Sequence, residues 1–478
     1  MKELVIFIAL LLHQIPMKQL GLLIAIFFLG SLGSLYHPFW AILLYYLLAV
    51  LRPQFLWKWA LPVEWRWSLF AAVIVFISLI ANAPRVLSRI RLNCIAVLMI
   101  LYGTWLMFSM LNAFDPLRAQ LFGQDIGKIL IMAIITSLVV DSLWQVRALT
   151  RMMFIALGYV AWEINTLYLS EGRIDIFHYG YGGLDNNGAG LLLAMGLPFA
   201  FTYATGSTKM WQRVVCGGVG LLMLHAVLMT YSRGAMVAST VGIAWLLIHH
   251  RPRVQSFLIV TVLAVALPFM AGQEIRERFQ STANYRTDGS GQSRLESWSA
   301  AWKIAWDHPL VGTGIRNSNR YSQNYGADRH NRTIHSQYLQ IAADSGLPAM
   351  TLFCAILGTS LALLTRCRNM CRDQLESSEA DPERKGKTEQ LMGLVNASQA
   401  SLVIYAVGGV FLSLEMFELP WLIMVTAGVM PYALQREFEP GRSEVEVAAQ
   451  HYPHLDQLKR MRSAAPAIVR SNRGVLGT

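Results

Sequence analysis

The sequence predicts an all-α polytopic membrane protein with about 12–14 transmembrane helices and one large, partly helical periplasmic loop. Hydrophobic residues make up 54% of the chain and charged residues only 14%, and the mean hydropathy is +0.41. Soluble domains carry roughly 25% charged residues. The apolar residues also gather in runs of about 15 to 20, long enough for a helix to cross the roughly 30 Å of hydrocarbon in a bilayer.

Thirteen apolar segments fit membrane spans. A further apolar stretch, residues 3–15, ends at Pro16 and is followed by no small-residue cleavage site. We expect a first span or an interfacial segment there rather than a cleaved signal peptide. The thirteen predicted spans fall near residues 20–36, 38–51, 66–82, 94–112, 127–141, 149–169, 188–205, 214–231, 234–249, 255–271, 347–366, 398–416 and 419–435.

Short basic loops set the predicted orientation. Alternate counting of the spans puts four of these loops on one side, which the positive-inside rule assigns to the cytoplasm. Their basic residues are Arg85, Arg89 and Arg91, then Arg147 and Arg151, then Lys209 and Arg213, then Arg251 and Arg253.

This orientation divides the chain into four predicted parts. Residues 1–271 form the N-terminal transmembrane helices, and residues 272–346 form a large periplasmic loop. Residues 347–435 form the C-terminal transmembrane helices with a cytoplasmic loop at 367–397, and residues 436–478 form a cytoplasmic tail. The periplasmic loop carries nine Lys or Arg residues. Long loops escape the positive-inside rule, so these residues need another explanation.

Charge and cysteine content exclude several classes of function. The net charge is +11 and the pI about 9.5, but much of the excess lies in short loops that fix orientation against the anionic inner leaflet. We therefore expect no nucleic-acid partner. The chain has five cysteines, none in the long loop, and so no disulfide framework. Cys367 and Cys371 are followed by no second ligand pair, which argues against a metal site.

Arg233 is the first of three candidate functional positions on the outer side. It lies in Thr230-Tyr-Ser-Arg-Gly-Ala235, between two apolar runs with almost no loop. A structural alternative is that Arg233 snorkels to the headgroups. However, it lies on the side that normally avoids positive charge, and Gly234 beside it allows close backbone approach. We therefore favour a functional role.

Arg294 is the second candidate. Ser293 and Glu296 fit a capping box, which predicts a helix start with Arg294 in its first turn. A basic residue there opposes the helix dipole and so indicates a strongly anionic partner. A stripe with helical spacing follows, and we expect it to pack on the membrane domain rather than to bind sugar: Leu295, Trp298, Trp302 and Ala305.

His335 is the third candidate, within RHNRTIHSQYLQIAADSGLP at residues 329–348. We expect a helix from about Ile334 to Ser345, with Gly346 as its C-terminal stop. A lone histidine is usually structural or merely exposed. Here it would lie in the first helical turn among arginines, which favour a neutral imidazole. A neutral imidazole can accept a proton from a hydroxyl, as a general base must.

Two arginines and a neutral histidine outside a membrane suit one chemistry in particular. A lipid-linked diphosphate arrives from the bilayer, arginine side chains bind its oxygens, and the histidine activates an incoming hydroxyl. The outer loops contain no Asp-x-Asp and no clustered set of carboxylates and histidines. Phosphate neutralisation would therefore depend on arginine rather than on Mg²⁺.

The outer segments resemble the O-antigen ligase and polymerase superfamily. HSQYLQIAADSG, residues 335–346, is similar to its His-Asn-x-x-Leu…Glu-x-Gly signature, with Ser336 for the usual Asn and Asp344 for the usual Glu. Four more segments look like this family: the turn at 232–234, the Arg294 helix start, the Gly312-Thr-Gly314 turn and LDNNGAGLLLAMGLP at 184–198.

The resemblance covers most of the chain from about residue 20 to 435. Within it, HPFWAILLYYLLAVLRPQFLW at residues 37–57 looks like a branch described as O-glycosylation ligases. The family implies His335 as catalytic base, with Arg233 and Arg294 binding undecaprenyl diphosphate. Further candidates for donor or acceptor contacts are Gln337, Tyr338, His330 and Asn187.

We predict an inner-membrane glycosyltransferase of the O-antigen ligase type. It would move a whole glycan from undecaprenyl diphosphate to a hydroxyl of lipid A–core oligosaccharide at the periplasmic face. The displacement would invert the configuration at the anomeric carbon. No metal or other cofactor would be needed. The loop at 272–346 would then be the catalytic loop.

Three alternatives remain. A polymerase of the same superfamily would use a growing lipid-linked glycan as acceptor, and a protein O-oligosaccharyltransferase would use serine or threonine. A lipid or polysaccharide transporter would carry charged residues at the midplane of spans or paired half-helices in repeats. Glu163, Glu415 and Glu418 lie in or beside spans, but no repeat is evident.

Overall fold

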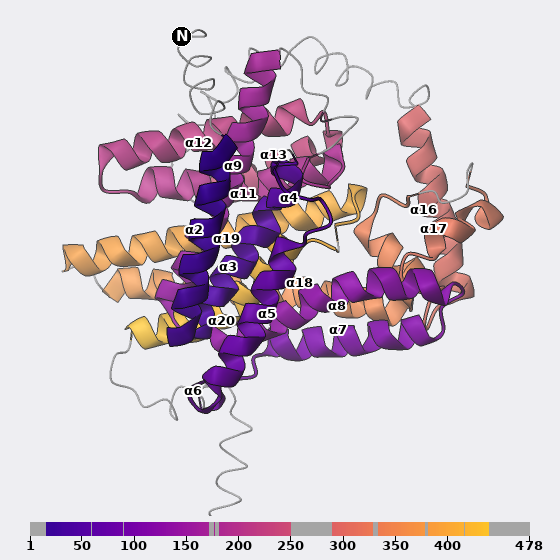
Figure 1. Cartoon of the computed structure of the whole chain (residues 1–478), viewed down its shortest axis with the longest axis horizontal. Coiled ribbons are helices and arrows are strands. Elements are labelled where there is room, and N and C mark those ends of the chain that lie inside the picture. The colour runs from indigo at the N-terminus through magenta and orange to yellow at the C-terminus, as the bar shows by residue number, and fades with distance from the viewer. Residues whose placement is uncertain are drawn as a thin grey trace, which may run out of the picture. The chain divides into compact units, whose positions relative to one another are not determined.

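The computed structural model describes residues 16–58, 60–88, 90–171, 176, 181–249, 289–327, 333–377, 381–414 and 416–438. In this part of the chain every regular element is a helix, as Figure 1 shows. Nine of these helices are long and apolar enough to cross a membrane, and two more apolar helices are shorter. The prediction of an all-α polytopic membrane fold is confirmed.

The helices follow the predicted spans closely. The elements of the first half are α2 (Pro16–Tyr36), α3 (Pro38–Leu51), α4 (Pro53–Leu56), α5 (Trp67–Ala81), α6 (Ala83–Leu87), α7 (Cys94–Leu111), α8 (Pro116–Val139), α9 (Leu143–Glu171), α11 (Asn186–Gly206), α12 (Met210–Met229) and α13 (Arg233–His249). Then come α16 (Gly289–Asp307), α17 (Ser318–Tyr321), the 3-10 helix η1 (Ser322–Tyr325), α18 (Gln337–Ser377), α19 (Pro382–Phe411) and α20 (Glu418–Phe438). The apolar segments at 3–15 and 255–271 lie outside the described residues.

The chain divides into two compact units, Met1–Pro431 and Tyr432–Thr478. The described residues of the second unit are limited to the end of α20.

Helix α19 occupies a central position in the first unit because it packs against α11, α13 and α18. Small and hydroxyl residues permit this close packing, as is usual between helices in membranes. Gly408 faces Leu191 of α11 so closely that a methyl group would overlap the leucine side chain. The Ser401 hydroxyl donates to the Met195 carbonyl of α11 at 2.9 Å. A polar contact and close packing thus fix α19 against its neighbour.

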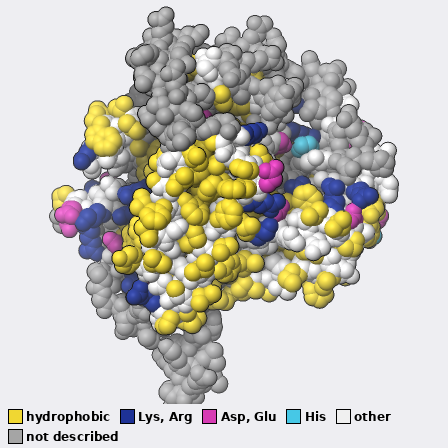
Figure 2. Space-filling view, viewed as in Figure 1, with side chains coloured by type: hydrophobic (Ala, Val, Ile, Leu, Met, Phe, Trp, Pro, Cys, Tyr) yellow, Lys and Arg dark blue, Asp and Glu magenta, His cyan; other side chains and the backbone are white. Residues whose placement is uncertain are grey.

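An exposed apolar surface extends over α2 and α5 and is visible in the middle of Figure 2. Phe28 and Leu29 of α2, with Ile77 and Ile80 of α5, are among its exposed side chains. Such contiguous apolar surface is typical of a lipid contact. The surface agrees with the membrane-spanning role of these helices.

A buried aromatic cluster joins four helices, α7, α18, α19 and α20. The Phe353 ring of α18 lies 6.0 Å from Trp421 of α20, 6.3 Å from Tyr405 of α19 and 6.2 Å from Tyr102 of α7, between ring centroids. Tyr338, near the start of α18, also packs on Phe353 at 6.1 Å. The cluster therefore connects the membrane helices to the segment that follows His335.

The segment predicted as a cytoplasmic loop at residues 367–397 is helical over its described residues, and its cytoplasmic position stays a prediction. Helix α18 continues to Ser377, and α19 already begins at Pro382. Charged pairs one turn apart support these polar ends: Arg372 with Glu376 at 3.4 Å and Lys387 with Glu383 at 2.6 Å. The Asp381 carboxylate also caps the start of α19 by accepting two backbone N–H bonds.

Candidate functional site

Arg233 is the first residue of α13, and a network of polar contacts holds the turn before it. The Ser232 hydroxyl accepts the Ala235 N–H at 3.3 Å, as an N-cap does, and donates to the Asn187 side-chain oxygen at 2.8 Å. The Asn186 amide donates to the Thr230 carbonyl at 3.0 Å. The start of α11 therefore fixes the turn that carries Arg233.

Arg294 lies in the second turn of α16 rather than at its start. The helix already includes Gly289, so the capping-box prediction at Ser293 was wrong. The predicted stripe is only half buried: Trp298 and Ala305 pack inward, whereas Leu295 and Trp302 are exposed. The buried face of α16 instead contains Ser297, Ala301 and Ile304, at spacings of four and three residues.

His335 precedes helix α18, which begins at Gln337, so its predicted position in the first helical turn was wrong. The Ser336 carbonyl accepts the first helical bond, from the Gln340 N–H at 2.9 Å, so Ser336 is in the N-cap position. His335 adopts a positive φ of 54°, a conformation that is uncommon for residues other than glycine. Strained backbone of this kind concentrates at functional sites.

The C-terminal end of α19 contacts residues close in sequence to each of the three predicted positions. Phe411 packs on Gly234, where an added Cβ would lie 3.0 Å from the phenylalanine Cβ, and its ring lies 6.3 Å from Trp298 of α16. Gly409 faces Gln337 and Tyr338, with an added Cβ 3.4 Å and 3.5 Å from their nearest atoms. We call Ala406–Phe411 the α19 hub. One end of one helix thus contacts the Arg233 turn, the Arg294 helix and the segment after His335.

A direct contact also joins the Arg294 helix to the His335 segment. The Ser297 hydroxyl donates to the Arg294 carbonyl at 2.9 Å and approaches the Ile334 carbonyl at 3.4 Å. Ile334 packs with Ala301 and Ala343 in a small buried cluster. The backbone on both sides of His335 is therefore anchored.

Two buried polar groups at the α19 hub have no hydrogen-bond partner among the described residues. Gln337 is 1% exposed, and neither the nitrogen nor the oxygen of its side-chain amide is bonded. The Trp298 indole nitrogen is also buried without a partner. Buried polar groups are normally satisfied. An amide and an indole N–H of this kind are suited to a ligand that carries hydroxyl groups.

Asp344 organises the segment after His335 from the far end of the first part of α18. This part ends at Gly346, where the helix is broken. Its carboxylate accepts hydrogen bonds from the Ser318 N–H at 3.0 Å, the Ser318 hydroxyl at 2.5 Å and the Gln340 amide at 2.6 Å. The residue that differs from the family's usual Glu is thus a buried structural carboxylate. It ties the loop around Ser318 to α18.

The Gly312-Thr-Gly314 turn packs on the same end of this helix. Thr313 and Gly314 donate backbone N–H bonds to the Ala343 and Asp344 carbonyls at 3.1 Å and 2.7 Å. Both glycines have positive φ, 65° and 101°. An added Cβ on Gly312 would overlap the Asp344 backbone. The motif therefore has a structural explanation, which is close approach to the helix that follows His335.

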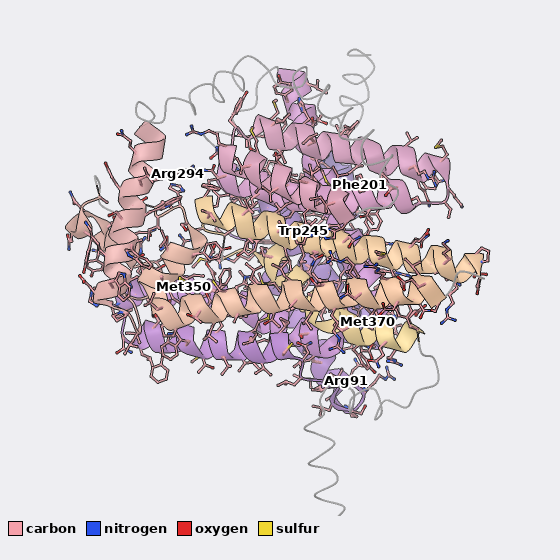
Figure 3. The ribbon with its side chains drawn as sticks, turned by 180° about the vertical axis from the view of Figure 1, so that it is seen from behind. Arg91, Phe201, Trp245, Arg294, Met350 and Met370 are labelled. Carbon is pink, nitrogen blue, oxygen red and sulfur yellow. The ribbon has the colours of Figure 1, made fainter. Side chains whose placement is uncertain are left out.

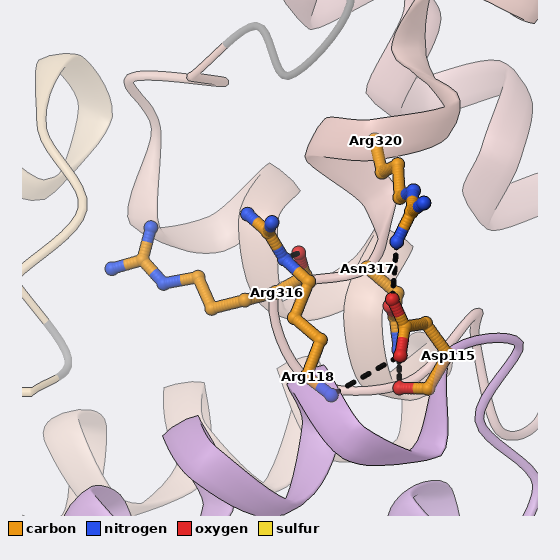
Figure 4. Close-up of polar contacts among 5 residues, drawn as sticks. All are labelled: Asp115, Arg118, Arg316, Asn317 and Arg320. Atoms are coloured by element: carbon orange, nitrogen blue, oxygen red, sulfur yellow. Dashed lines mark hydrogen bonds and ion pairs between the residues drawn. The ribbon is translucent and has the colours of Figure 1, made fainter.

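The hairpin of α7 and α8 holds this loop from its other side. Asp115, the N-cap of α8, is ion-paired with Arg320, and its carbonyl accepts the Asn317 amide at 3.2 Å. The Arg118 Nε donates to the Arg316 carbonyl at 2.7 Å. Figure 4 shows the guanidinium groups of Arg118 and Arg316 on the side away from the Asp115–Arg320 pair. Sequence reasoning missed these contacts because nothing local to Asp115 or Arg118 indicates a partner 200 residues away.

The four further candidate contacts have different outcomes. Asn187 orients Ser232, and the Tyr338 hydroxyl donates to the Ala406 carbonyl at 2.8 Å, so both support the site structurally. Gln337 has the unpartnered amide at the α19 hub. His330 lies outside the described residues. The described residues contain no group of three or more His, Cys, Asp or Glu side chains that could hold a metal ion.

Two family models match the chain. A model described as O-Antigen ligase matches residues 218–354, and one described as a family of unknown function (DUF5935) matches residues 17–170. A search of curated proteins finds no match. The first region contains Arg233, Arg294 and His335, and the second contains the α7–α8 hairpin.

These findings define a multi-pass membrane protein, and the family match over residues 218–354 suggests enzyme activity of the glycosyltransferase type. The match of residues 218–354 to the model described as O-Antigen ligase confirms the resemblance to that superfamily. The description of the N-terminal family assigns no function. The resemblance of residues 37–57 to O-glycosylation ligases therefore remains a prediction.

Proposed function

We propose that this protein is an O-antigen ligase-type glycosyltransferase of the inner membrane. It transfers a glycan from undecaprenyl diphosphate to a hydroxyl of lipid A–core oligosaccharide at the periplasmic face. The observation that carries the proposal is the α19 hub, which contacts the Arg233 turn, the Arg294 helix and the segment after His335. The O-antigen ligase match supports the reaction class.

In the proposed mechanism His335 is the general base. Its imidazole takes the proton from the acceptor hydroxyl, and the oxygen attacks the anomeric carbon of the donor sugar from the face opposite the diphosphate. The bond from that carbon to the diphosphate oxygen breaks, the diphosphate leaves with the electron pair, and the configuration inverts. A positioned base of this kind contributes about 10²–10⁴-fold to the rate.

Arg233 and Arg294 stabilise the leaving diphosphate. Their guanidinium groups bind phosphate oxygens through charge-assisted hydrogen bonds, which strengthen as negative charge develops on the leaving group. Arg233 is the first residue of α13, so the backbone N–H groups of this helix N-terminus lie beside it and also favour an anion.

The unpartnered groups at the α19 hub support a sugar ligand beside the diphosphate. The Gln337 amide offers both a donor and an acceptor, and the Trp298 indole offers a donor. Sugar hydroxyls provide matching acceptors and donors. On this reading the two groups receive their missing hydrogen bonds when the glycan binds.

The transporter alternative receives less support, because two of its three acidic residues have local partners. Glu163 accepts a hydrogen bond from the Tyr159 hydroxyl at 2.5 Å, one helical turn away. Glu418 lies 3.7 Å from Arg52, which also donates to the Gly182 carbonyl at 3.2 Å. Glu415 lies outside the described residues.

The test is reconstitution of purified protein with an undecaprenyl diphosphate-linked glycan and lipid A–core. His335→Ala should lower the initial ligation rate by about 10²–10⁴-fold because the base is lost. Arg233→Ala and Arg294→Ala should each lower it by about 10²–10³-fold because leaving-group stabilisation is lost. Gel shift of the acceptor measures the product.

Two matched controls accompany these variants. Lys303→Gln changes an exposed basic residue on the same helix as Arg294, and His308→Phe changes a second histidine of the same loop while keeping a ring to pack on Phe114. Both should retain nearly full activity. The mechanism is wrong if His335→Ala ligates at half the wild-type rate or more while the controls behave as expected.

The same assay separates the related acceptors. Offered lipid A–core, a growing lipid-linked glycan and a serine- and threonine-containing protein in turn, the enzyme should modify the first. Extension of the lipid-linked glycan would identify a polymerase instead, and modification of protein would identify an O-oligosaccharyltransferase. A transporter would form no glycosidic bond with any of the three.

A further inference from the structure

A second polar site lies at the other end of α19. A cavity of about 880 Å³ is bordered by the ends of α11 and α13, the start of α12, the polar end of α18 and the first turns of α19. Glu389 in its wall and Phe411 in the α19 hub are separated by about 33 Å along the helix, at 1.5 Å per residue. In Figure 3, Arg294 lies toward the Met350 end of α18, whereas Met370 marks the end near the cavity. The cavity is therefore distinct from the proposed ligation site.

Basic side chains exceed acidic ones in the cavity wall. Four residues carry positive charge and two carry negative charge: Arg213, Arg368, Arg372 and Lys385, against Glu376 and Glu389. One of the carboxylates is already paired, since Glu376 lies 3.4 Å from Arg372. The remaining wall therefore favours an anionic ligand.

Two of the arginines are held by neutral partners. The Arg368 guanidinium donates to the Gln399 amide oxygen at 3.1 Å, and Gln399 in turn donates to the Thr365 hydroxyl at 2.8 Å. The Arg213 Nε donates to the Ser207 carbonyl at 2.7 Å. These contacts orient the guanidinium groups without neutralising their charge. Preoriented arginines are well suited to phosphate oxygens.

A buried acceptor completes the wall. Asn396 is 5% exposed, and its side-chain oxygen has no hydrogen-bond partner within the described ranges. Its amide nitrogen donates to the His249 carbonyl at 3.4 Å, which fixes the side chain between α19 and α13. An unpartnered acceptor fits the hydroxyl or amine donors that accompany a phosphate in a headgroup.

The surroundings of the cavity match a membrane interface. Ile248 in its wall is 76% exposed, and Met210 and Trp211, beside Arg213, are also exposed. Exposed apolar side chains and tryptophan next to arginine are typical of the level of the lipid headgroups. Basic pockets between membrane helices at this level of the bilayer bind anionic lipid headgroups.

We propose that this cavity binds a phosphate-bearing ligand with adjacent hydroxyl groups, and that the ligand is an anionic phospholipid. Arg213, Arg368 and Lys385 bind the phosphate, and the Asn396 oxygen accepts a headgroup hydroxyl. This assignment is independent of the proposed ligation function, because none of these residues belongs to the α19 hub.

Binding of defined lipids to the purified full chain tests the proposal. Native mass spectrometry with phosphatidylglycerol and phosphatidylcholine should give saturable binding of the former with at least about tenfold preference. Arg213→Gln and Lys385→Gln should each weaken phosphatidylglycerol binding by about fivefold, because each basic side chain near the membrane surface contributes comparably. Lys385 is exposed, so its substitution leaves the fold intact.

Lys387→Gln is the matched control. Lys387 lies two residues further along α19, is paired with Glu383 and does not border the cavity, so this variant should bind as the wild type does.

Competition with inorganic phosphate identifies the source of the ligand. Full displacement of the lipid at millimolar phosphate would support the anion site but assign it to a soluble phosphate compound. Equal binding of both lipids, unchanged in Arg213→Gln and Lys385→Gln, would overturn the proposal.

Discussion

At the scale of single residues, Gln337 is the most informative side chain of the candidate site. It is almost fully buried, yet its amide makes no hydrogen bond with the described residues. Burying an unsatisfied amide costs about 1–3 kcal/mol. An apolar side chain of similar size would avoid that cost. Hydrogen bonding to a ligand therefore explains a glutamine at position 337 better than a contribution to stability does.

Replacement of this residue separates the two explanations. Gln337→Met should raise the free energy of unfolding by about 1–3 kcal/mol because the unsatisfied amide is removed. It should also lower the ligation rate by about tenfold because the hydrogen bonds to the sugar are lost. Thermal unfolding in detergent and the reconstituted assay measure the two effects.

A second glutamine on the same helix provides the control. The Gln340 amide donates to both Asp344 and Ser318, at 2.6 Å and 3.0 Å, so Gln340→Met should lower stability instead. If Gln337→Met lowered stability as Gln340→Met does, the amide would have a structural role and the ligand explanation would fail.

At the scale of elements, the break in α18 at Gly346 sets the direction of the helix that follows His335. Gly346 has φ 86°, and Leu347 donates its N–H to the Pro309 carbonyl at 2.8 Å. A Cβ on Gly346 would overlap the Leu310 carbonyl. The short helix before the break and the spanning helix after it are therefore separate elements, which meet at a position that only glycine fits.

A methyl group at this position should disturb the site. Gly346→Ala should lower the free energy of unfolding by at least about 2 kcal/mol, because the backbone conformation and the space both exclude a side chain. Ligation should fall with it. Gly358→Ala, on the same helix with nothing within 4 Å of an added Cβ, should leave stability unchanged or raise it by up to about 1 kcal/mol. Equal thermal unfolding of the two variants would show that the break is not fixed in this way.

At the scale of the whole first unit, the two family regions interlock. The Trp105 indole of α7 donates to the Ser345 carbonyl at 3.1 Å and the Leu310 carbonyl at 3.3 Å. The Ser109 hydroxyl donates to the Asp344 carbonyl at 3.1 Å. With the Asp115–Arg320 pair, these contacts attach the DUF5935 region to the loop of the O-antigen ligase region. The N-terminal region thus supports the segment that follows His335.

Removal of one hydrogen-bond donor across this contact should affect stability and activity together. Trp105→Phe keeps a ring but leaves two carbonyls without the indole N–H, at a cost of about 1 kcal/mol. The melting temperature and the ligation rate should both decrease, although Trp105 lies outside the matched ligase region. Trp306→Phe changes an exposed tryptophan and should alter neither. A normal ligation rate in Trp105→Phe would contradict a supporting role for α7.

The helices were predictable from sequence because an apolar run of sufficient length has one satisfactory backbone conformation in lipid. The break at Gly346 was also predictable, since a glycine followed by Pro348 is a local signal. Helix starts were less predictable. Ser293 and Glu296 have the spacing of a capping box, but α16 begins earlier, at Gly289. The segment at 367–397 was predicted as a connection between spans because it has mixed charges and few apolar residues, a pattern that does not reveal the helix-stabilising pairs Arg372–Glu376 and Lys387–Glu383.

The centre of the candidate site was beyond sequence reasoning. Phe411 and Gly409 lie more than 60 residues after His335 and follow an unremarkable apolar run. Their role depends on the packing of α19 between α11, α13 and α18. A periodic pattern indicates that one face of a helix is buried. It does not indicate which side chains of other helices pack against that face.

The position of the α19 hub has a consequence for the exchange of segments between related enzymes. Phe411 and Gly409 lie outside residues 218–354, as do Asp115 and Trp105. A chimera that received only the matched ligase region would carry Arg233, Arg294 and His335 without the residues that pack on the segments around them. Transfer of function between relatives would therefore require three blocks in register: the α7–α8 hairpin, the ligase domain and the end of α19.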